Sequence, residues 1–509
     1  MSEASQALQK IARGTGIVFA GTIISMLFGF LSRAVIARYF STGEYGVFNL
    51  ALTVLNIALV VATLGFQNAL PREVAFYRER EPSKIGDLVS TALVIVAASS
   101  FVITVLLVLG SGFAARVFSE ERLVYALKIA ALALPFWALT SVVVAVSRGF
   151  GRVREQVYFR NIVYPIVWLV LVVLMAVLGL PFTSIFWMYI LTQSAVFLAL
   201  VFEVHRIRLF NVKPSFDPAL GKKLVLFSLP LMFVGILNFL MTWTDTLMLG
   251  YYKGSEVVGL YNAATPLARL IPIFLGSASV IYSPIVTSLY AQGKIGEMGR
   301  VYQILTKWVF LLTLPIFAVM FLFPKATISF LFGEKYVSAA PALQILSLGF
   351  MFHTFLGLNG MTLIVIGKPK LNMVGDTFAV VSNISLNLAL IPRYGMVGAA
   401  VATAVSYFVA NVFRSYWLYK MTGIHPFSWN YVKPLGISFL LLGVLKWLNL
   451  DVEDIWHAIP VLVVFLAVYA LLVLLSRSID REDVELLLTV EKRLGINLGR
   501  IKKILRKFV

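Results

Sequence analysis

Two arginines, Arg33 and Arg269, lie within long apolar stretches of the chain. A charged side chain is costly inside a lipid bilayer, so an arginine that is kept there is expected to have a function. A guanidinium group presents several N–H donors in a planar fork that matches the oxygen atoms of a phosphate. We therefore expect Arg33 and Arg269 to face a polar cavity and to bind an anionic group in it.

Uncharged polar residues recur at helical spacing beside these arginines. Asn49 and Asn56 are seven residues apart in one apolar stretch, and Asn262 precedes Arg269 by the same interval. Residues at this spacing share one face of a helix, and a polar face inside a membrane must meet protein or water. The asparagines therefore either line the same substrate-binding cavity as Arg33 and Arg269, or form hydrogen bonds between neighbouring helices.

The composition of the chain is that of an integral membrane protein. Of its 509 residues, 60% are hydrophobic and 13% are charged, and the mean hydropathy is +0.90. The apolar residues form runs of about 18 or more, the length of a membrane-spanning helix. We expect an all-α protein with 14 transmembrane helices. The eighth is long enough to tilt, to bend at Pro266, Pro272 or Pro284, or to project from the bilayer.

Several kinds of functional site are missing from the sequence. It contains no cysteine, four histidines without the spacing of metal ligands, and no glycine-rich phosphate-binding loop. These features exclude a thiolate metal site and a recognisable route of ATP hydrolysis. The net charge of +19 lies mostly in short loops, so we expect it to set orientation in the membrane rather than to bind nucleic acid.

Basic residues also predict the orientation of the chain. Lysine and arginine are about four times as frequent in one alternate set of loops as in the other, and basic loops stay in the cytoplasm. We therefore expect a multi-pass protein of the cell membrane with both termini in the cytoplasm. Arg160, Lys307 and Arg414 lie near cytoplasmic helix ends, and we expect their side chains to extend toward the membrane surface.

Two stretches of the chain repeat the same residue types at an offset of 213 residues. The matched pairs are Gly46 with Gly259, Asn49 with Asn262, Pro71 with Pro284, and Tyr77 with Tyr290. Six helices per repeat give both repeats the same orientation, which predicts two pseudo-symmetric lobes. The predicted parts are an N-terminal lobe (1–205), a cytoplasmic linker (206–222), a C-terminal lobe (223–420), two extra helices (421–478) and a cytoplasmic amphipathic tail (479–509).

The repeat also suggests residues for gating or ion coupling. At an offset of 212 residues, Arg33 falls on Asp245, so two opposite charges occupy equivalent places in the outer third of the membrane. They either approach each other when the outer side is closed, or each pairs within its own lobe. Arg38 and Asp376 are further candidates, and Asp376 either binds H⁺ or Na⁺ or pairs with a nearby lysine.

Short motifs carry a resemblance to a known family. The stretch 31–40, Gly43-Glu44-Tyr45-Gly46, the stretch 259–264, and loops with a glycine followed by alternating basic residues carry it. The pattern resembles the multidrug/oligosaccharidyl-lipid/polysaccharide exporter superfamily, and within it the oligosaccharide flippases of the polysaccharide transporter family. That resemblance implies a two-lobed, alternating-access fold with a central cationic cavity. It also places Arg33 and Arg269 where related lipid II flippases use arginines.

The resemblance implies a transporter rather than an enzyme. We expect a flippase that moves a polyprenyl phosphate- or diphosphate-linked oligosaccharide from the cytoplasmic to the outer leaflet, for cell-surface polysaccharide or glycoprotein assembly. No cofactor is expected, and a Na⁺ or H⁺ gradient is one of the energy sources left open. The expected partners are the lipid-linked oligosaccharide and membrane lipids, and we expect a monomer that works beside glycosyltransferases.

Two other functions are weighed against this one. A cation-coupled multidrug exporter of the same superfamily needs acidic cavity residues, whereas the first helix carries Arg33. A membrane glycosyltransferase or polymerase needs a large outer loop or an acidic catalytic motif, and the sequence has neither.

Overall fold

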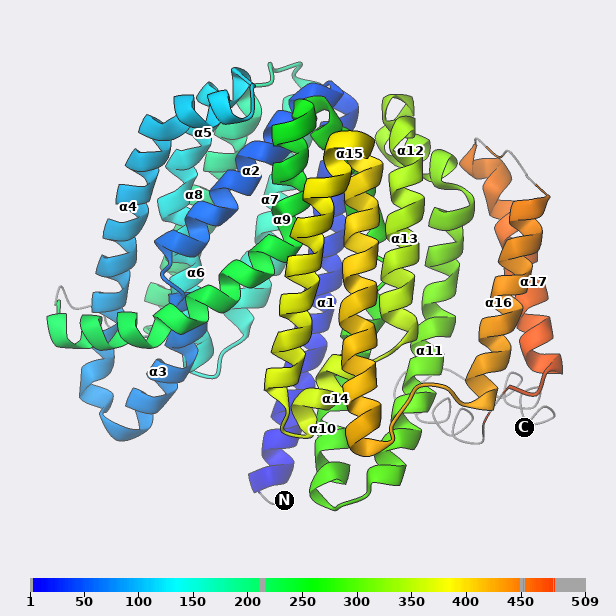
Figure 1. Cartoon of the computed structure of the whole chain (residues 1–509). Coiled ribbons are helices and arrows are strands. Elements are labelled where there is room, and N and C mark those ends of the chain that lie inside the picture. Colours follow the sequence, from blue (N-terminus) through cyan, green and yellow to red (C-terminus); the bar gives the residue numbers. More distant parts are fainter. Residues whose placement is uncertain (1–2, 210–215, 449–451, 453, 479, 481–509) are drawn as a thin grey trace. The chain divides into compact units, whose positions relative to one another are not determined.

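The computed structural model describes residues 3–209, 216–448, 452, 454–478 and 480. Within these ranges it describes side chains from Gly21 onward, apart from those at 234, 238, 280 and 281. Every regular element in the described part is a helix (Figure 1), so the predicted all-α fold is confirmed there. The predicted amphipathic tail, 479–509, lies outside the described residues except for Asp480.

The chain divides into two compact units, Met1–Asn262 and Ala263–Val509. The first contains α1 (Glu3–Tyr39), α2 (Thr42–Ala62), α3 (Phe66–Arg80), η1 (Pro82–Lys84), α4 (Ile85–Val117), α5 (Arg122–Ala130), η2 (Ala131–Ala133), α6 (Leu134–Gly149), the π-helix η3 (Gln156–Val163), α7 (Tyr164–Val177), α8 (Ser184–Arg206) and most of α9 (Pro218–Ala268). This division follows contacts, whereas the predicted lobes follow the repeat, so the lobe boundaries stay a prediction.

The second unit contains the remaining helices. They are α10 (Ile273–Ala291), α11 (Ile295–Leu322), α12 (Pro324–Phe332), η4 (Glu334–Ala339), α13 (Ala340–Phe355), α14 (Asn359–Val365), α15 (Pro369–Thr422), α16 (Trp429–Trp447) and α17 (Ile455–Leu475). Here α13 packs against α11 and α15. In the first unit, α6 packs against α3, α4 and α8, and α1 packs against η3 and α7.

Within the described residues, 11 helices are long and apolar enough to cross a membrane, or 12 if a bent pair is counted as one span. The bent pair, Phe239–Ala268 and Ile273–Ser279, turns by 48° at a break that contains Pro272. A bend at Pro272 is one of the alternatives that the sequence left open for the eighth span. Two of the long helices, α9 and α15, are interrupted by non-helical backbone at Gly254 and Gly395. Figure 1 shows α15 folding back into two limbs. The expected total of 14 transmembrane helices stays a prediction.

Equivalent positions of the sequence repeat have the same local geometry. The Asn49 amide donates to the carbonyl four residues earlier at 2.7 Å, and the Asn262 amide does the same at 3.0 Å. Gly151 and Gly367, in the two glycine-basic loops, have φ angles of +74° and +75°. Glycine adopts this left-handed region without the steric penalty that a side chain brings. These matches are what a duplicated unit predicts.

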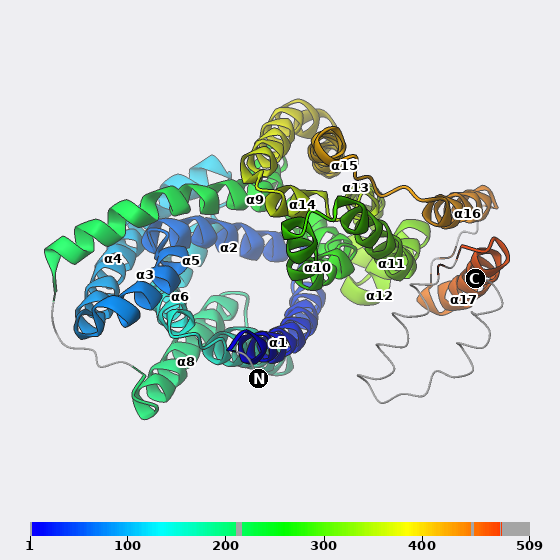
Figure 2. The same cartoon turned by 90° about the horizontal axis from the view of Figure 1, so that it is seen from below.

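An ion-pair cluster holds α16 and the end of α17 against α11 in the C-terminal unit. Lys307 on α11 is 2% exposed and donates to Asp480 at 2.5 Å, and Asp480 also accepts from Arg300 and Asn430. Figure 2 shows α16 and α17 side by side. The expectation that Lys307 extends to the membrane surface is wrong, because its ammonium group has a buried carboxylate partner.

Candidate functional site

Tyr45 is the centre of a polar cluster in the N-terminal unit. The Tyr45 side chain is fully buried on α2, and its hydroxyl donates to the backbone carbonyl of Asn262 at 3.4 Å. It also interacts with the Asn49 side chain and lies within electrostatic reach of Arg33. The fold therefore brings Arg33, Asn49 and Asn262 around one tyrosine. Tyr45 belongs to a motif in the sequence, but helical spacing alone does not place it in the site.

Arg33 and Arg38 are both exposed near the end of α1. Arg33 lies within electrostatic reach of Tyr164 on α7 as well as of Tyr45. A guanidinium group that is exposed inside a membrane helix needs water or an anion around it. The position of Arg33 is consistent with the predicted cavity, whose substrate contacts stay a prediction.

The asparagines of α2 bond within their own helix. Asn49 and Asn56 are partly exposed, and each amide donates to the carbonyl four residues earlier, at 2.7 and 2.8 Å. Asn262 differs, because it is buried and also exchanges hydrogen bonds with Thr246 at 3.2 and 3.4 Å. The structure therefore gives Asn262 a packing role across the two limbs of α9, and leaves Asn49 and Asn56 partly exposed on α2.

Asp245 is buried on the first limb of α9. The Tyr261 hydroxyl on the second limb donates to the Asp245 carboxylate at 2.5 Å. A charge-assisted hydrogen bond of this kind stabilises a buried carboxylate. The predicted approach of Arg33 and Asp245 during gating stays a prediction.

A second polar cluster lies near the start of α2. It joins the end of α4, the start of α5 and the start of the second limb of α9. The Arg122 guanidinium at the start of α5 pairs with Glu120 at 2.8 Å and donates to Ser255 at 3.4 Å, and the Ser255 hydroxyl donates to Glu120. Burial raises the pKa of Glu120, but the hydrogen bonds from Arg122 and Ser255 outweigh this effect, so the pKa is lowered overall. Glu120 is therefore ionised at neutral pH and binds the start of the second limb of α9.

Two predicted residues belong to the C-terminal unit. Arg269 is partly buried at the break between α9 and α10, and its backbone N–H donates to the carbonyl of Thr265 at 3.1 Å. Asp376 on α15 pairs with Arg414 and accepts from Asn372 at 3.3 Å. Arg414 is mostly buried, so this pairing replaces the expected extension of its side chain to the membrane surface.

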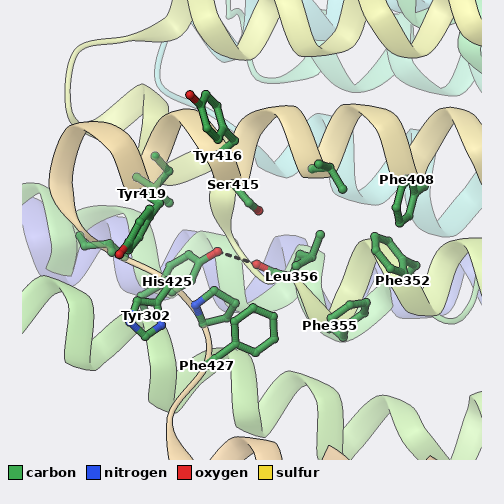
Figure 3. A pocket seen from close by; sticks show the side chains of 14 residues that line it. Tyr302, Phe352, Phe355, Leu356, Phe408, Ser415, Tyr416, Tyr419, His425 and Phe427 are labelled. Carbon is green, nitrogen blue, oxygen red and sulfur yellow. Dashed lines mark hydrogen bonds between the residues drawn. The ribbon is translucent and has the colours of Figure 1, made fainter.

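A pocket of about 420 Å³ opens at one end of the C-terminal unit (Figure 3). Aromatic side chains from α13 and α15 line it, including Phe352, Phe355 and Phe408, and Phe427 covers it from the following loop. The Tyr302 hydroxyl bonds the carbonyl of Leu356 at 2.5 Å beside it. The lining carries no Asp, Glu, Lys or Arg, so this pocket suits hydrocarbon rather than a phosphate.

Arg160 was expected to extend toward the membrane surface, but the sequence did not predict its π-helix or its neighbour Arg148. It lies on the π-helix η3, surrounded by protein but still exposed, and within electrostatic reach of Tyr164 and of Arg148 on α6. π-helical segments are rare and are frequent at functional sites. An arginine in an apolar stretch is the only sequence signal for this group, since nothing in the composition of 156–163 indicates a π-helix.

Two protein families match the chain. The polysaccharide biosynthesis protein family matches residues 11–289, and the MatE family matches residues 230–389. The chain belongs to the polysaccharide biosynthesis protein family. This membership confirms the resemblance to polysaccharide transporters of the multidrug/oligosaccharidyl-lipid/polysaccharide exporter superfamily.

Two known proteins are similar to the chain over most of its length. Uncharacterized membrane protein MJ1068 of Methanocaldococcus jannaschii is 25% identical over 463 residues, which cover 85% of this chain and 89% of that protein. The "Probable low-salt glycan biosynthesis flippase Agl15" of Haloferax volcanii is 24% identical over 436 residues, which cover 86% and 89%. These relatives support a multi-pass membrane transporter that is related to flippases.

Solved structures share the fold. The lipid II flippase MurJ in an inward closed conformation has a TM-score of 0.70 at 15% identity and covers 92% of this chain and 99% of that chain. An inward-facing multidrug resistance transporter of the MATE family has a TM-score of 0.62 at 15% identity and covers 84% and 96%. At these identities the likeness concerns the fold alone.

Proposed function

We propose that this protein is a flippase that moves a polyprenyl phosphate- or diphosphate-linked oligosaccharide from the cytoplasmic to the outer leaflet by alternating access. The observation that carries the proposal is the cluster of Arg33, Tyr45 and Asn49 in a member of the polysaccharide biosynthesis protein family. An arginine fork suits the phosphate, and hydroxyl and amide groups suit a sugar. In this proposal the transported lipid-linked sugar serves cell-surface polysaccharide or glycoprotein assembly.

Each predicted residue has a role in this proposal. Arg33 and Arg269 bind the phosphate, and Asn49, Asn56 and Asn262 bind or position the sugar. Asp245, Arg38 and Asp376 take part in gating or in coupling to Na⁺ or H⁺. These assignments rest on residue type and on where each residue lies within its own unit.

The setting in the cell is also part of the proposal. Basic loops support cytoplasmic N- and C-termini in the cell membrane. We expect a monomer without a cofactor that works beside the glycosyltransferases that build its substrate. The lobes at 1–205 and 223–420 would carry the alternating-access movement.

A cation-coupled multidrug exporter is the second candidate, because the MatE family matches residues 230–389. An exporter of organic cations needs an exposed carboxylate in its cavity. The exposed charges near the end of α1 are instead the cations Arg33 and Arg38, and the Asp245 carboxylate is buried under Tyr261. These charges favour an anionic substrate.

A reconstituted flipping assay tests the proposal. Purified protein in vesicles is given a fluorescent polyprenyl-diphosphate oligosaccharide, and its transfer between leaflets is measured with an impermeant quencher. We expect Arg33→Gln and Arg269→Gln each to slow transfer at least ten-fold, whereas Arg116→Gln, which changes an exposed residue at the end of α4, leaves the rate within two-fold.

Two results decide between the candidates. If Arg33→Gln and Arg269→Gln both transfer the lipid-linked sugar at the rate of the unchanged protein, the assignment of these arginines to the site is wrong. Transport of an organic cation with no transfer of the lipid-linked sugar would support the multidrug exporter instead.

A further inference from the structure

Three arginines and one tyrosine form a series of neighbouring side chains in the N-terminal unit. They are Arg148 on α6, Arg160 on η3, Tyr164 on α7 and Arg33 on α1. Each lies within electrostatic reach of the next, from Arg148 to Arg160, from Arg160 to Tyr164, and from Tyr164 to Arg33. We call these four residues the arginine track.

The packing of α1 beside η3 and α7 determines how far the arginine track extends. A Cβ atom at Gly21 would lie 2.5 Å from Val157 on η3, and the Tyr39 hydroxyl donates to the carbonyl of Leu180 at 3.0 Å. The helix α1 therefore runs beside η3 and α7 in the same direction. Arg33 is 12 residues beyond Gly21, a rise of about 18 Å along a helix. The track thus leads from Arg148 on α6 past η3 to Arg33 near the end of α1.

The first two arginines repel each other, and no described carboxylate compensates them. The nearest one in sequence, Glu155, pairs with Arg152 at 2.7 Å. Arg148 donates to the backbone carbonyl of Gln67 at 2.6 Å, and its buried Nε has no hydrogen-bond partner within the described residues. Two like charges held together in a protein-lined site are unfavourable unless an anion joins them. The arrangement is therefore that of an anion site.

Hydroxyl and amide groups continue the track past Arg160. The Tyr164 hydroxyl is hydrogen-bonded to that of Tyr189, and the Gln193 amide donates to the Tyr189 hydroxyl at 3.1 Å. Tyr189 and Gln193 are buried, so this chain of hydrogen bonds fixes the Tyr164 hydroxyl between the two charges. The Tyr164 hydroxyl is a fixed, neutral hydrogen-bond donor between Arg160 and Arg33. A phosphate that moves from one arginine to the other could therefore keep a hydrogen bond on the way.

We infer that Arg148 and Arg160 form a capture site for the phosphate of a prenyl-linked substrate, and that the phosphate then passes Tyr164 to reach Arg33. The inference rests on the proposed function, and it adds a first binding stage on the cytoplasmic side. Arg148 and Arg160 are binding residues in this scheme, Tyr164 is a binding residue between the stages, and Tyr189 is a positioning residue.

Binding of a soluble lipid phosphate tests the capture site apart from transport. The probe is farnesyl diphosphate, with farnesol and inorganic pyrophosphate as comparison ligands, and the protein is the purified full chain in detergent. We expect Arg148→Gln and Arg160→Gln each to weaken farnesyl diphosphate binding about ten-fold, and Arg160→Lys, which keeps the charge but loses the fork, to weaken it less.

Equal binding of farnesol would show that the phosphate is not what the site recognises, and would overturn the inference. Pyrophosphate that binds as tightly as farnesyl diphosphate would show a free-phosphate site and would also overturn it.

The matched control is Arg154→Gln. Arg154 is an exposed arginine just before η3, its guanidinium lies 5.6 Å from the centre of the Tyr158 ring, and it is not among the electrostatic partners of the track residues. We expect binding by this variant to stay within two-fold of the unchanged protein. Tyr164→Phe removes a single hydroxyl and provides a second variant if the arginine variants do not fold.

Flipping kinetics separate the inference from the proposed function. We expect Arg148→Gln and Arg160→Gln to raise the half-saturating substrate concentration with little change in the maximal rate, whereas Arg33→Gln lowers the maximal rate. If the unchanged protein flips the lipid-linked sugar and the Arg148 and Arg160 variants bind and flip as it does, the capture site is wrong and the function stands. If farnesyl diphosphate binds through Arg160 but no lipid-linked sugar is flipped, the capture site stands and the function is wrong.

Discussion

Gly46 and Gly259 meet where α2 crosses the second limb of α9 within the N-terminal unit. A Cβ atom at Gly46 would lie 1.7 Å from the backbone oxygen of Ser255, and one at Gly259 would lie 2.1 Å from that of Thr42. Each would also lie 3.0 or 3.1 Å from the backbone nitrogen of the other glycine. The two residues are equivalent in the sequence repeat, so the repeat brings two copies of one bare helix surface together. Small residues permit this approach of helix backbones in membranes.

We expect Gly46→Ala and Gly259→Ala to force this crossing apart. The added methyl groups meet backbone atoms, which cannot move aside as a flexible side chain would. The measurement is labelling of a single cysteine introduced at Asn49 by an impermeant maleimide, and we expect it to rise several-fold in either variant. Gly110→Ala is the control, because a Cβ atom at Gly110 on α4 meets no atom within 4 Å. Unchanged labelling in both variants would mean that the crossing does not limit access to α2.

The gating role of Arg33 and Asp245 can be tested by crosslinking. The natural chain has no cysteine, so Arg33→Cys with Asp245→Cys introduces the only two thiols. If the two residues approach each other when the outer side closes, the crosslinking yield should differ at least several-fold between conditions that favour opposite access states. A yield that is independent of access state would remove the pair from the gate. Arg38→Cys with Asp245→Cys is a matched pair, with the arginine about one turn further along α1.

The stabilising contribution of Glu120, with its partners Arg122 and Ser255, should be lost at low pH. Because the folded-state pKa of Glu120 is lowered, its stabilising contribution is complete above the ordinary carboxyl pKa of 4.5 and is lost as the pH falls through the lower folded value. Glu120→Gln imitates the protonated state, and we expect it to lower the thermal midpoint at pH 7 and to reduce the further loss on acidification. Glu121→Gln, at an exposed neighbour, should leave the midpoint and its pH dependence unchanged. A Glu120→Gln variant with the full pH dependence of the unchanged protein would show that another group titrates.

Asp480 should stabilise the C-terminal unit strongly. Asp480→Asn leaves the buried Lys307 without its carboxylate, and removing one partner of a buried pair costs about 3 kcal/mol. We expect a clear fall in the thermal midpoint in detergent. The double variant Lys307→Met with Asp480→Asn should recover part of the loss, because the unpaired charge is gone.

Glu297→Gln is the control for Asp480. The Glu297 side chain is 62% exposed and lies 3.8 Å from Lys294, so its loss should change the free energy of unfolding by less than about 0.5 kcal/mol. Burial of the Asp480 carboxyl group raises its pKa, but hydrogen bonds from Lys307, Arg300 and Asn430 outweigh this effect, so the pKa of Asp480 is lowered overall. The contribution of Asp480 is therefore present at neutral pH and lost only in acid below the ordinary carboxyl range. Equal midpoints for Asp480→Asn and Glu297→Gln would mean that the cluster does not hold α16 and α17.

The sequence by itself determined the class, the repeat and the family of this protein. Long apolar runs fix helices that cross a membrane, since the bilayer leaves backbone groups no other partners. Residues that match at a constant offset in the sequence also have the same local geometry. Asn49 and Asn262, for example, each donate a hydrogen bond to the backbone carbonyl four residues earlier. Several short motifs, including the one around Tyr45, together indicated the family, which the match over residues 11–289 confirmed.

Only the tertiary structure decided which charges have partners. Three cations lie near the end of an apolar stretch and have the same sequence pattern: Arg160, Lys307 and Arg414. The sequence predicted for all three that the side chain extends to the membrane surface. The fold gives Lys307 the Asp480 carboxylate and Arg414 the Asp376 carboxylate, but places Arg160 beside another arginine. These partners are 173 and 38 residues away for Lys307 and Arg414, and helical spacing describes only neighbours within one helix. The pairing of distant side chains depends on how helices pack, which no local pattern encodes.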